Sequence, residues 1–142
     1  MNQFEDYDKE VAAIRAYNQP VFDAFQGWLQ ASGLTAKTIK KHLDNIDFFT
    51  DYLTYYEPLC RLDEADEGDV ASFLMDWYPR KAMWASVSST KSYLASFRKF
   101  FKFMGQTGRL ADDRVAEILD TLKQQREDFL AAIEDDEEDD WW

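Results

Sequence analysis

Residues 22–53, FDAFQGWLQASGLTAKTIKKHLDNIDFFTDYL, decide the fold. Their apolar side chains recur every three or four positions in two runs, which predicts two amphipathic helices joined by a short turn. Gly33 is suited to a residue just past a helix end, and Thr35 is the predicted N-cap of the second helix. Pro58 is expected to close that helix. The two apolar runs are Phe22, Phe25, Trp28 and Leu29, and then Ile39, Leu43, Ile46, Phe49, Leu53 and Tyr56.

On the N-terminal side, residues 4–17 predict a further helix. Pro20 is expected to interrupt it and to begin the helix described above, since proline is tolerated in a first turn. On the C-terminal side, residues 60–68 read as a polar connection. Asp69 is the predicted cap of a short helix that Pro79 stops. The expected buried face of that helix is Val70, Phe73, Leu74 and Trp77.

Two more helices are expected after residues 80–86. Ser86, Ser88 or Ser89 could cap the first, and Asp112 or Asp113 opens the second. No segment alternates with the period of a strand. The prediction is an all-α fold, a compact bundle of four to six helices. The inward positions are Leu94, Phe97, Phe101 and Met104, flanked by Tyr93, Phe100 and Phe103, and then Val115, Ile118, Leu119, Leu122, Phe129 and Ile133.

The composition is that of one folded domain. Of the 142 residues, 46% are hydrophobic and 16% aromatic, which is enough for a real core and unlike a disordered acidic chain. The single cysteine, Cys60, cannot form an internal disulfide. The acidic start does not resemble a signal peptide, and no apolar run approaches about 18 residues. We therefore expect a cytoplasmic protein that does not contact a membrane.

The net charge of −12 is unevenly distributed. Residues 1–34 carry a net −3, residues 35–109 a net +1, and residues 110–142 a net −10. Because nucleic-acid affinity depends on clustered Lys and Arg, the near-neutral centre leaves DNA binding open. The expected organisation is an N-terminal helical extension (1–18), a helical domain (19–133) and an acidic tail (134–142).

Three ordered stretches resemble the core-binding, SAM-like N-terminal domain of phage integrases and related tyrosine recombinases. They are residues 22–53, residues 68–77 (GDVASFLMDW) and residues 88–110 (SSTKSYLASFRKFFKFMGQTGRL). The matching positions are Phe25, Leu29, Gly33, Leu34, Thr35, Thr38, Ile46, Phe49 and Leu53; then Asp69, Val70, Phe73 and Leu74; then Thr90, Leu94, Arg98, Phe100, Phe101 and Gly108. One departure is His42, where the family usually has an aromatic residue.

The resemblance implies that the second and fourth helices of the family's domain lie against duplex DNA. Lys37, Lys40 and Lys41 share one helix face, as do Lys91, Arg98 and Lys102. Ser88 and Ser89 stand at the start of the second cluster. Lys and Thr side chains at a helix N-terminus suit phosphate oxygens. The predicted DNA-binding residues are Lys37, Thr38, Lys40, Lys41, Thr90, Lys91, Arg98 and Lys99.

No catalytic site is expected. Recombinases of this type use a Tyr nucleophile activated by two Arg and a His or Lys in a C-terminal domain. Only about 20 residues remain after the resembling bundle, and they are rich in acids, so the prediction is a non-enzyme without cofactor. One His and one Cys cannot build a zinc site. Asp63, Asp66 and Asp69 faintly resemble a calcium loop with Gly68 at its sixth position, but no Glu closes the loop at position twelve.

Two functions remain open. The first is a non-catalytic DNA-binding module in a DNA-integration or recombination context, with duplex DNA or a recombinase as partner. The alternative is a protein-interaction or regulatory domain that has lost DNA binding. Three interpretations of the acidic tail stay open: a solubilising end, a competitor with DNA for the basic patch, or a DNA mimic toward a basic partner. The aromatic residues expected to include a partner patch are Trp77, Tyr78, Trp84, Trp141 and Trp142.

Overall fold

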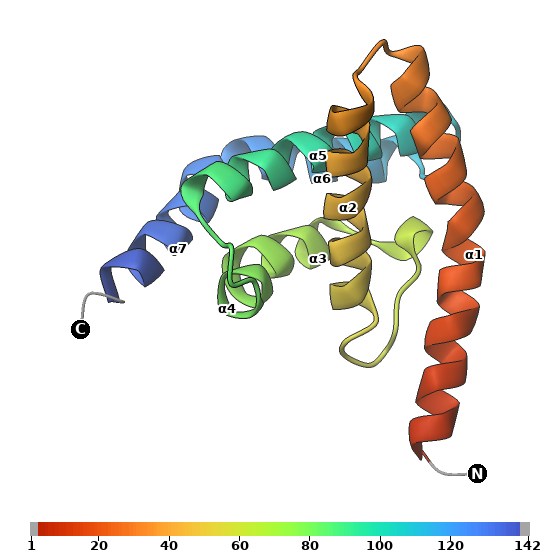
Figure 1. The fold of residues 1–142 in the computed structure, drawn as a ribbon, viewed down its shortest axis with the longest axis horizontal. Helices are drawn as coiled ribbons and strands as arrows, with labels where there is room; N and C mark the ends of the chain where they lie inside the picture. The colour runs from red at the N-terminus through yellow and green to blue at the C-terminus, as the bar shows by residue number, and fades with distance from the viewer. Residues whose placement is uncertain (1–2, 140–142) are drawn as a thin grey trace. The chain divides into compact units, whose positions relative to one another are not determined.

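The computed structural model describes residues 3–139, and the side chains of residues 3–133. Every regular element in that range is helical, so the predicted all-α class is confirmed (Figure 1). None of the described helices is both long and apolar enough to cross a membrane. The chain divides into two compact units, residues 1–65 and 66–142, called unit 1 and unit 2 below.

Unit 1 begins with one long helix, α1 (Gln3–Ala31). The predicted break at Pro20 is wrong, because the helix passes through this proline. The buried side chains of α1 continue at three- and four-residue spacing across it, so one face stays packed while Pro20 itself is exposed. These buried residues are Ile14, Asn18, Val21, Phe25 and Leu29.

The second long helix of unit 1 is α2 (Ala36–Leu53), which packs against α1. Thr35 is its N-cap as predicted, and its hydroxyl accepts a hydrogen bond from the backbone N–H of Thr38 at 3.2 Å. The helix ends at Leu53 rather than near Pro58, so Tyr56 lies outside it with 49% of its surface exposed. His42, which stands where the family usually has an aromatic residue, is buried.

The connection after α2 is held to α1 by polar contacts. Tyr7 donates its hydroxyl proton to the carbonyl of Thr54 at 2.5 Å. Further along, the amide of Leu62 donates to the side-chain oxygen of buried Asn18 at 3.2 Å. Leu62 begins the short 3-10 turn η1 (Leu62–Glu64), so α1 positions the whole segment up to the end of unit 1.

Unit 2 opens with three consecutive helical segments: α3 (Glu67–Ser72), the π-helical turn η2 (Phe73–Trp77) and α4 (Tyr78–Lys81). Asp66, not Asp69, caps α3, because the two carboxylates form a capping box. Each accepts the other residue's backbone N–H at 3.0 Å. The predicted stop at Pro79 is also wrong. This proline lies in the first turn of α4, and the helix continues beyond it to Lys81.

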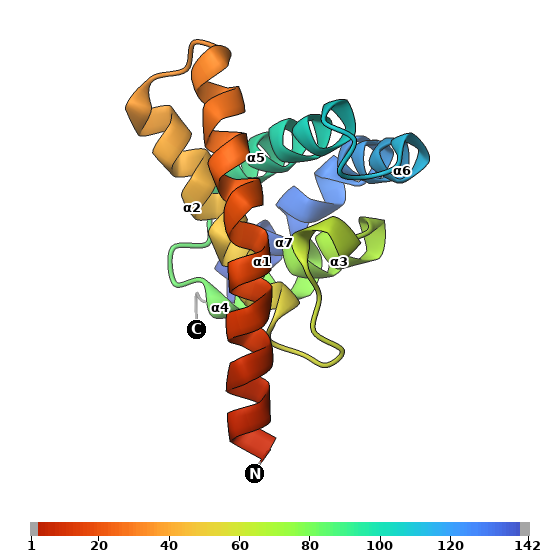
Figure 2. The ribbon, with the colours of Figure 1, turned by 90° about the vertical axis from the view of Figure 1, so that its right-hand side faces the viewer.

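The remaining helices are α5 (Val87–Gln106), α6 (Asp112–Gln124) and α7 (Arg126–Asp139). Of the three candidate caps, Ser86 is the N-cap of α5, in a capping box with Ser89. The single helix predicted after residue 112 is two helices, interrupted at Gln125. Helix α5 packs against both of them, as the turned view also shows (Figure 2).

The core of unit 2 is aromatic. The Phe73 ring lies 5.5 Å from Tyr93, 5.7 Å from Tyr78 and 5.7 Å from Phe97, measured between ring centroids. The predicted inward face of the short helix is confirmed, with Trp77 also buried. This cluster fixes the inner side of α5, and therefore also determines which of its side chains face solvent.

Candidate nucleic-acid interface

The first two turns of α2 present three lysines to solvent. Lys37, Lys40 and Lys41 are exposed and lie on the side of the helix away from buried Ile39 and Ile46. Lys40 forms an ion pair with Asp44, one turn later, at 2.7 Å. Among the described side chains, neither Lys37 nor Lys41 has an ion pair. Two cations are therefore available at this end of the helix.

Thr38 lies beside these lysines at the capped end of α2. Its hydroxyl oxygen accepts a hydrogen bond from the Thr35 hydroxyl at 3.0 Å, and the residue is exposed. The Thr38 hydroxyl keeps its own proton for an external acceptor. A hydroxyl, two ammonium groups and a helix N-terminus form a good local environment for a phosphate.

The rest of α2 is acidic on its exposed side. Arg15 of α1 lies 2.5 Å from a carboxylate oxygen of Asp51 and 3.7 Å from one of Asp47. Burial raises the pKa of Asp47, nearby Asp51 raises it further, and Arg15 partly offsets both effects. These carboxylates restrict the anion-attracting part of α2 to its first two turns.

Helix α5 has a charge distribution that favours phosphate binding more than that of α2. It carries four basic residues and no Asp or Glu. At 3.6 residues per turn, Lys91, Arg98 and Lys102 fall within about 40° around the helix axis, and they span about 16 Å along it. All three are exposed and Lys99 is half-buried. None of the four forms an ion pair with another described side chain. We call Lys91, Arg98, Lys99 and Lys102 the α5 basic face.

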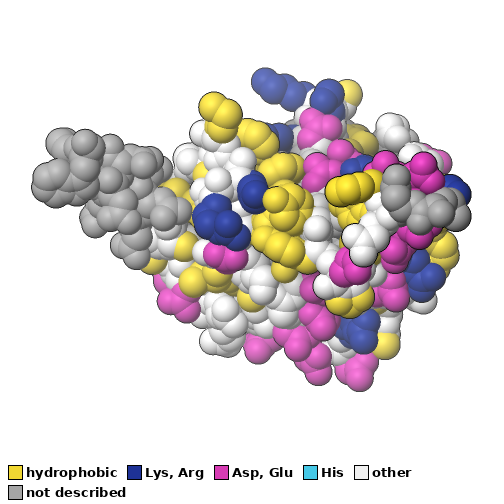
Figure 3. Space-filling model, turned by 90° about the horizontal axis from the view of Figure 1, so that it is seen from below, with side chains coloured by type: hydrophobic (Ala, Val, Ile, Leu, Met, Phe, Trp, Pro, Cys, Tyr) yellow, Lys and Arg dark blue, Asp and Glu magenta, His cyan; other side chains and the backbone are white. Residues whose placement is uncertain are grey.

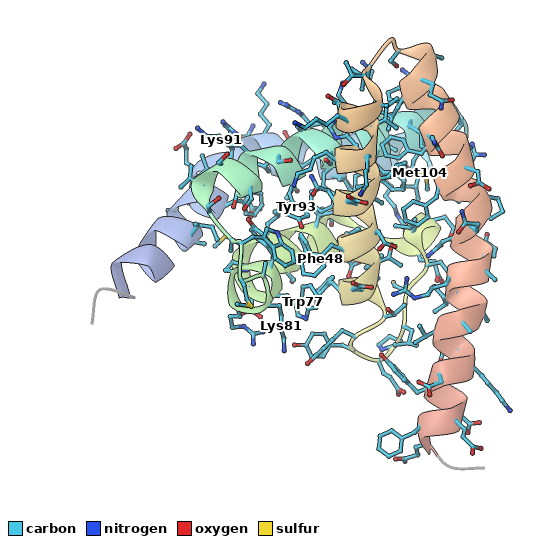
Figure 4. The ribbon with its side chains drawn as sticks, viewed as in Figure 1. Phe48, Trp77, Lys81, Lys91, Tyr93 and Met104 are labelled. Atoms are coloured by element: carbon cyan, nitrogen blue, oxygen red, sulfur yellow. The ribbon has the colours of Figure 1, made fainter. Side chains whose placement is uncertain are left out.

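This face is opposite the core side of the helix. Figure 4 shows Lys91 near the start of α5 and pointing outward, on the other side of the helix from Tyr93. Tyr93 and Met104 are both buried. The aromatic packing of unit 2 therefore holds the basic side chains toward solvent, where they can reach a polyanion.

Thr90 differs from the other predicted contact residues, because it is completely buried. Its hydroxyl donates to the phenolic oxygen of Tyr78 at 3.2 Å, and the same phenol is hydrogen-bonded to Ser89. Thr90 thus links α5 to α4 inside unit 2. As described, its side chain cannot reach a phosphate, and the set of contacts proposed below omits it.

A sequence signal for this region was missed. Between Trp77 and Ala111 the chain has seven basic residues and no Asp or Glu, within a protein of net charge −12. A window count of acidic residues would have identified it. Arg80, Lys81 and Arg109 are the members that do not belong to the predicted clusters, and Arg80 and Arg109 are both engaged. Arg80 pairs with Asp76 at 3.0 Å, and the Arg109 guanidinium lies 5.1 Å from the centroid of the Phe103 ring.

No group of three His, Cys, Asp or Glu side chains in residues 3–133 could hold a metal ion. Asp66 and Asp69 are occupied with capping α3, and Asp63 accepts hydrogen bonds from Tyr17 at 2.7 Å and Arg61 at 3.1 Å. Cys60 is half-buried. The basic surfaces of α2 and α5 are thus the strongest candidate sites.

An all-helical fold with an exposed, acid-free basic helix is typical of a nucleic-acid-binding module. The family model described as "Phage integrase, N-terminal SAM-like domain" matches residues 22–108, and the chain belongs to this family. The predicted SAM-like fold is thereby confirmed. The chain is also similar to a tyrosine recombinase, XerD of Listeria innocua serovar 6a. The two are 28% identical over 107 residues, which is 75% of this chain and 35% of the relative.

The chain therefore spans about a third of the length of this relative. No solved structure matched the present chain. Membership of this family indicates a DNA-recombination context. The matched residues include both α2 and α5.

Proposed function

We propose that this protein is a non-catalytic DNA-binding module that acts in DNA integration or recombination. The α5 basic face is the observation that carries the proposal. It holds four cations without a carboxylate on the same helix, in a chain that is otherwise strongly acidic. Its length of about 16 Å matches about five base-pair steps of 3.4 Å. The face is therefore long enough to follow the phosphates of one strand.

The proposed contacts on α2 are Lys37, Thr38, Lys40 and Lys41. Those on α5 are Lys91, Arg98, Lys99 and Lys102. Every proposed lysine and arginine is at least partly exposed, and most have no ion pair among residues 3–133. Phosphate contacts of this kind position a protein on a duplex without reading its sequence. The partner in this proposal is duplex DNA, alone or within a recombinase assembly.

Fluorescence anisotropy of a labelled duplex, titrated with the full chain over a series of salt concentrations, tests the proposal. With about five phosphate contacts, a plot of log affinity against log salt should have a slope near −4.5. Absence of binding at about 50 mM salt, both by the full chain and by a variant with neutral residues in place of the acids at 134–140, would reject DNA binding.

A second candidate function is binding to another protein, and one turn of unit 2 favours it. The amide of Ala85 donates to the carbonyl of Ala82 at 3.1 Å, which places Met83 and Trp84 at the tip of the turn. Met83 is fully exposed and Trp84 is 52% exposed, whereas polar residues are usual at such positions. Exposed tryptophan is frequent in the energetic centres of interfaces.

The exposed aromatic patch that could bind a protein partner contains fewer residues than the sequence predicted. Trp77 and Tyr78 are buried and cannot belong to an exposed patch, and Trp141 and Trp142 lie outside the described residues. Figure 3 shows one face of the molecule on which hydrophobic side chains (yellow) reach the surface. Light-scattering mass measurement separates the candidates. A dimer that persists at high salt and ignores DNA, but is lost in Trp84→Ala, favours protein binding.

A further inference from the structure

Unit 1 has an open groove between its two long helices. Helices α1 and α2 pack side by side (Figure 1). One part of the groove, about 370 Å³ in volume, lies between residues 15–26 of α1 and residues 43–50 of α2. A second part, of about 470 Å³, continues along residues 26–30 and 34–44. From Arg15 to Gln30 the groove is about 22 Å long at 1.5 Å per helical residue. The two parts are continuous, because both are lined by Gln26, Leu43 and Asp44.

The floor of this α1–α2 groove is apolar and incompletely covered. Phe22 and Leu43 belong to the apolar runs from which the two helices are predicted, but both are only half-buried. Their neighbours Phe25 and Ile46, by contrast, have no exposed surface. Since Phe22 and Leu43 line the groove, their open sides face it. Apolar side chains of another molecule could cover them there.

The rim beside this floor is acidic. Lys40 pairs with Asp44 at 2.7 Å, whereas Arg15 lies closer to Asp51, at 2.5 Å, than to Asp47, at 3.7 Å. Burial raises the pKa of Asp47, so its ionised form is poorly solvated, and a further cation would stabilise it. The rim therefore complements a basic side chain best at Asp47. The acidic residues that line this part of the groove are Asp23, Asp44 and Asp47.

A buried amide at the same end has an unused hydrogen-bond donor. Asn18 lines the groove although its side chain is only 1% exposed, so it forms part of the deepest wall. Its Oδ1 accepts a hydrogen bond from the amide of Leu62 at 3.2 Å, while its Nδ2 has no hydrogen-bond partner among the described residues. Because a buried donor without an acceptor is unfavourable, a ligand that supplies an oxygen here gains affinity.

We propose that the α1–α2 groove binds a segment of a partner protein that carries a Lys or Arg beside an aliphatic residue. In this complex the aliphatic side chain packs on Phe22 and Leu43, and the cation lies beside Asp47. A main-chain carbonyl of the segment accepts a hydrogen bond from Nδ2 of Asn18. A length of about 22 Å accommodates about six residues of an extended segment. A simple cation would leave the apolar floor uncovered, and the carboxylates of the rim disfavour DNA.

An NMR titration of the ¹⁵N-labelled full chain, without DNA and at about 50 mM salt, tests this proposal. The probe is an acetylated and amidated leucyl-arginyl-leucine peptide. The side-chain amide of Asn18 and the backbone amides of Phe22 and Leu43 should shift. A peptide with citrulline, which has the shape of arginine without its charge, should bind about threefold more weakly. A peptide with alanine in place of both leucines should bind about tenfold more weakly.

A matched pair of variants tests the place of the cation. Asp47→Asn keeps the shape of the side chain and should weaken binding of the arginine peptide about threefold, without affecting the citrulline peptide. Asp8→Asn removes the same charge from an exposed position near the start of α1 and should change neither. The proposal is overturned by absence of these shifts at peptide concentrations up to about 10 mM, by equal affinity of the three peptides, or by equal effects of the two variants.

Two other outcomes would assign the groove to a different occupant and so reject the proposal. Shifts of the same groove signals when the chain alone is concentrated would indicate a second copy of the chain. Equal shifts with arginine amide alone would indicate a site for a small cation. The proposal goes beyond DNA binding and does not depend on it. Because no DNA is present in these measurements, failure of either proposal leaves the other standing.

Discussion

The hydroxyl of Thr90 donates a hydrogen bond to the phenolic oxygen of Tyr78, 3.2 Å away, inside unit 2. Both residues are completely buried, and they join the start of α5 to α4. Through this pair the orientation of α5 is tied to the aromatic core. Thr90, which was predicted from the sequence to contact DNA, therefore helps to hold the basic side chains of α5 on the outer side of the helix.

Replacing Thr90 with valine is expected to lower the free energy of unfolding. The DNA affinity of the folded protein should not change. The side chains have nearly the same shape, so the loss is that of one buried hydrogen bond, about 1–2 kcal/mol. Urea denaturation measures this loss. Ser88→Ala, on the exposed first turn of α5, is the matched control and should leave stability nearly unchanged. Weaker DNA binding by folded Thr90→Val would restore Thr90 as a contact residue.

Neutralising the α5 basic face should weaken DNA binding stepwise. Arg98→Gln and Lys102→Gln should each reduce affinity about three- to tenfold and lower the salt slope by about one, because each removes one phosphate contact. Anisotropy titrations at several salt concentrations give both values. Lys123→Gln removes the same charge from an exposed position on α6 and should have a much smaller effect. Equal effects at all three positions would indicate a net-charge effect rather than a defined face.

On α2, removing a carboxylate should strengthen binding. Asp44 holds Lys40 at 2.7 Å, so Asp44→Asn frees one cation beside Lys37 and Lys41 and removes a charge that repels phosphate. An increase in DNA affinity of about threefold is expected. The control Asp8→Asn changes the charge of the chain by the same amount near the start of α1. Similar affinities for the two variants would argue against a role for the start of α2.

The cap of α2 predicts a separate effect on stability. Thr35→Ala removes the acceptor for the Thr38 amide, and the expected cost is about 0.5–2 kcal/mol. Thr35→Ser keeps a hydroxyl and should restore most of this loss. Thermal denaturation followed by circular dichroism compares the three proteins. If the alanine variant is as stable as the original, the capping bond contributes nothing to the stability of unit 1.

Asp69 provides a prediction about pH. Burial raises the pKa of this carboxyl above its ordinary value, so the folded chain binds its proton at a higher pH than the unfolded chain does. At pH values above this raised pKa, ionised Asp69 therefore destabilises the folded chain. The penalty disappears as pH falls and the carboxyl becomes protonated. Asp69→Asn keeps an acceptor for the Asp66 amide and removes the charge. Its urea midpoint should exceed that of the original chain at pH 7.

The advantage of Asp69→Asn should shrink as pH falls and vanish below the ordinary pKa of an aspartate, about 3.9, where the original carboxyl is protonated in both the folded and the unfolded chain. An advantage that stays constant from pH 7 to pH 4 would mean that the variant acts through packing rather than charge. Asp113→Asn, at an exposed position in the first turn of α6, shows what loss of one acidic charge does without burial.

The sequence by itself determined the features that depend on near neighbours in the chain. Apolar spacing identified the helical class, the inward faces of α2, α3 with η2, and α5, and the cap at Thr35. It also placed most of the exposed cations correctly. A repeat of three or four residues and a capping hydroxyl act over one or two turns, so they can be read without knowing the fold.

Only the tertiary structure decided features that depend on what a segment packs against. Pro20 lies within α1 because the buried face of that helix continues on both sides of it. Thr90 is inside rather than outside because Tyr78 reaches it from another helix. Burial is a property of contacts between elements distant in sequence, and periodicity alone does not specify those contacts.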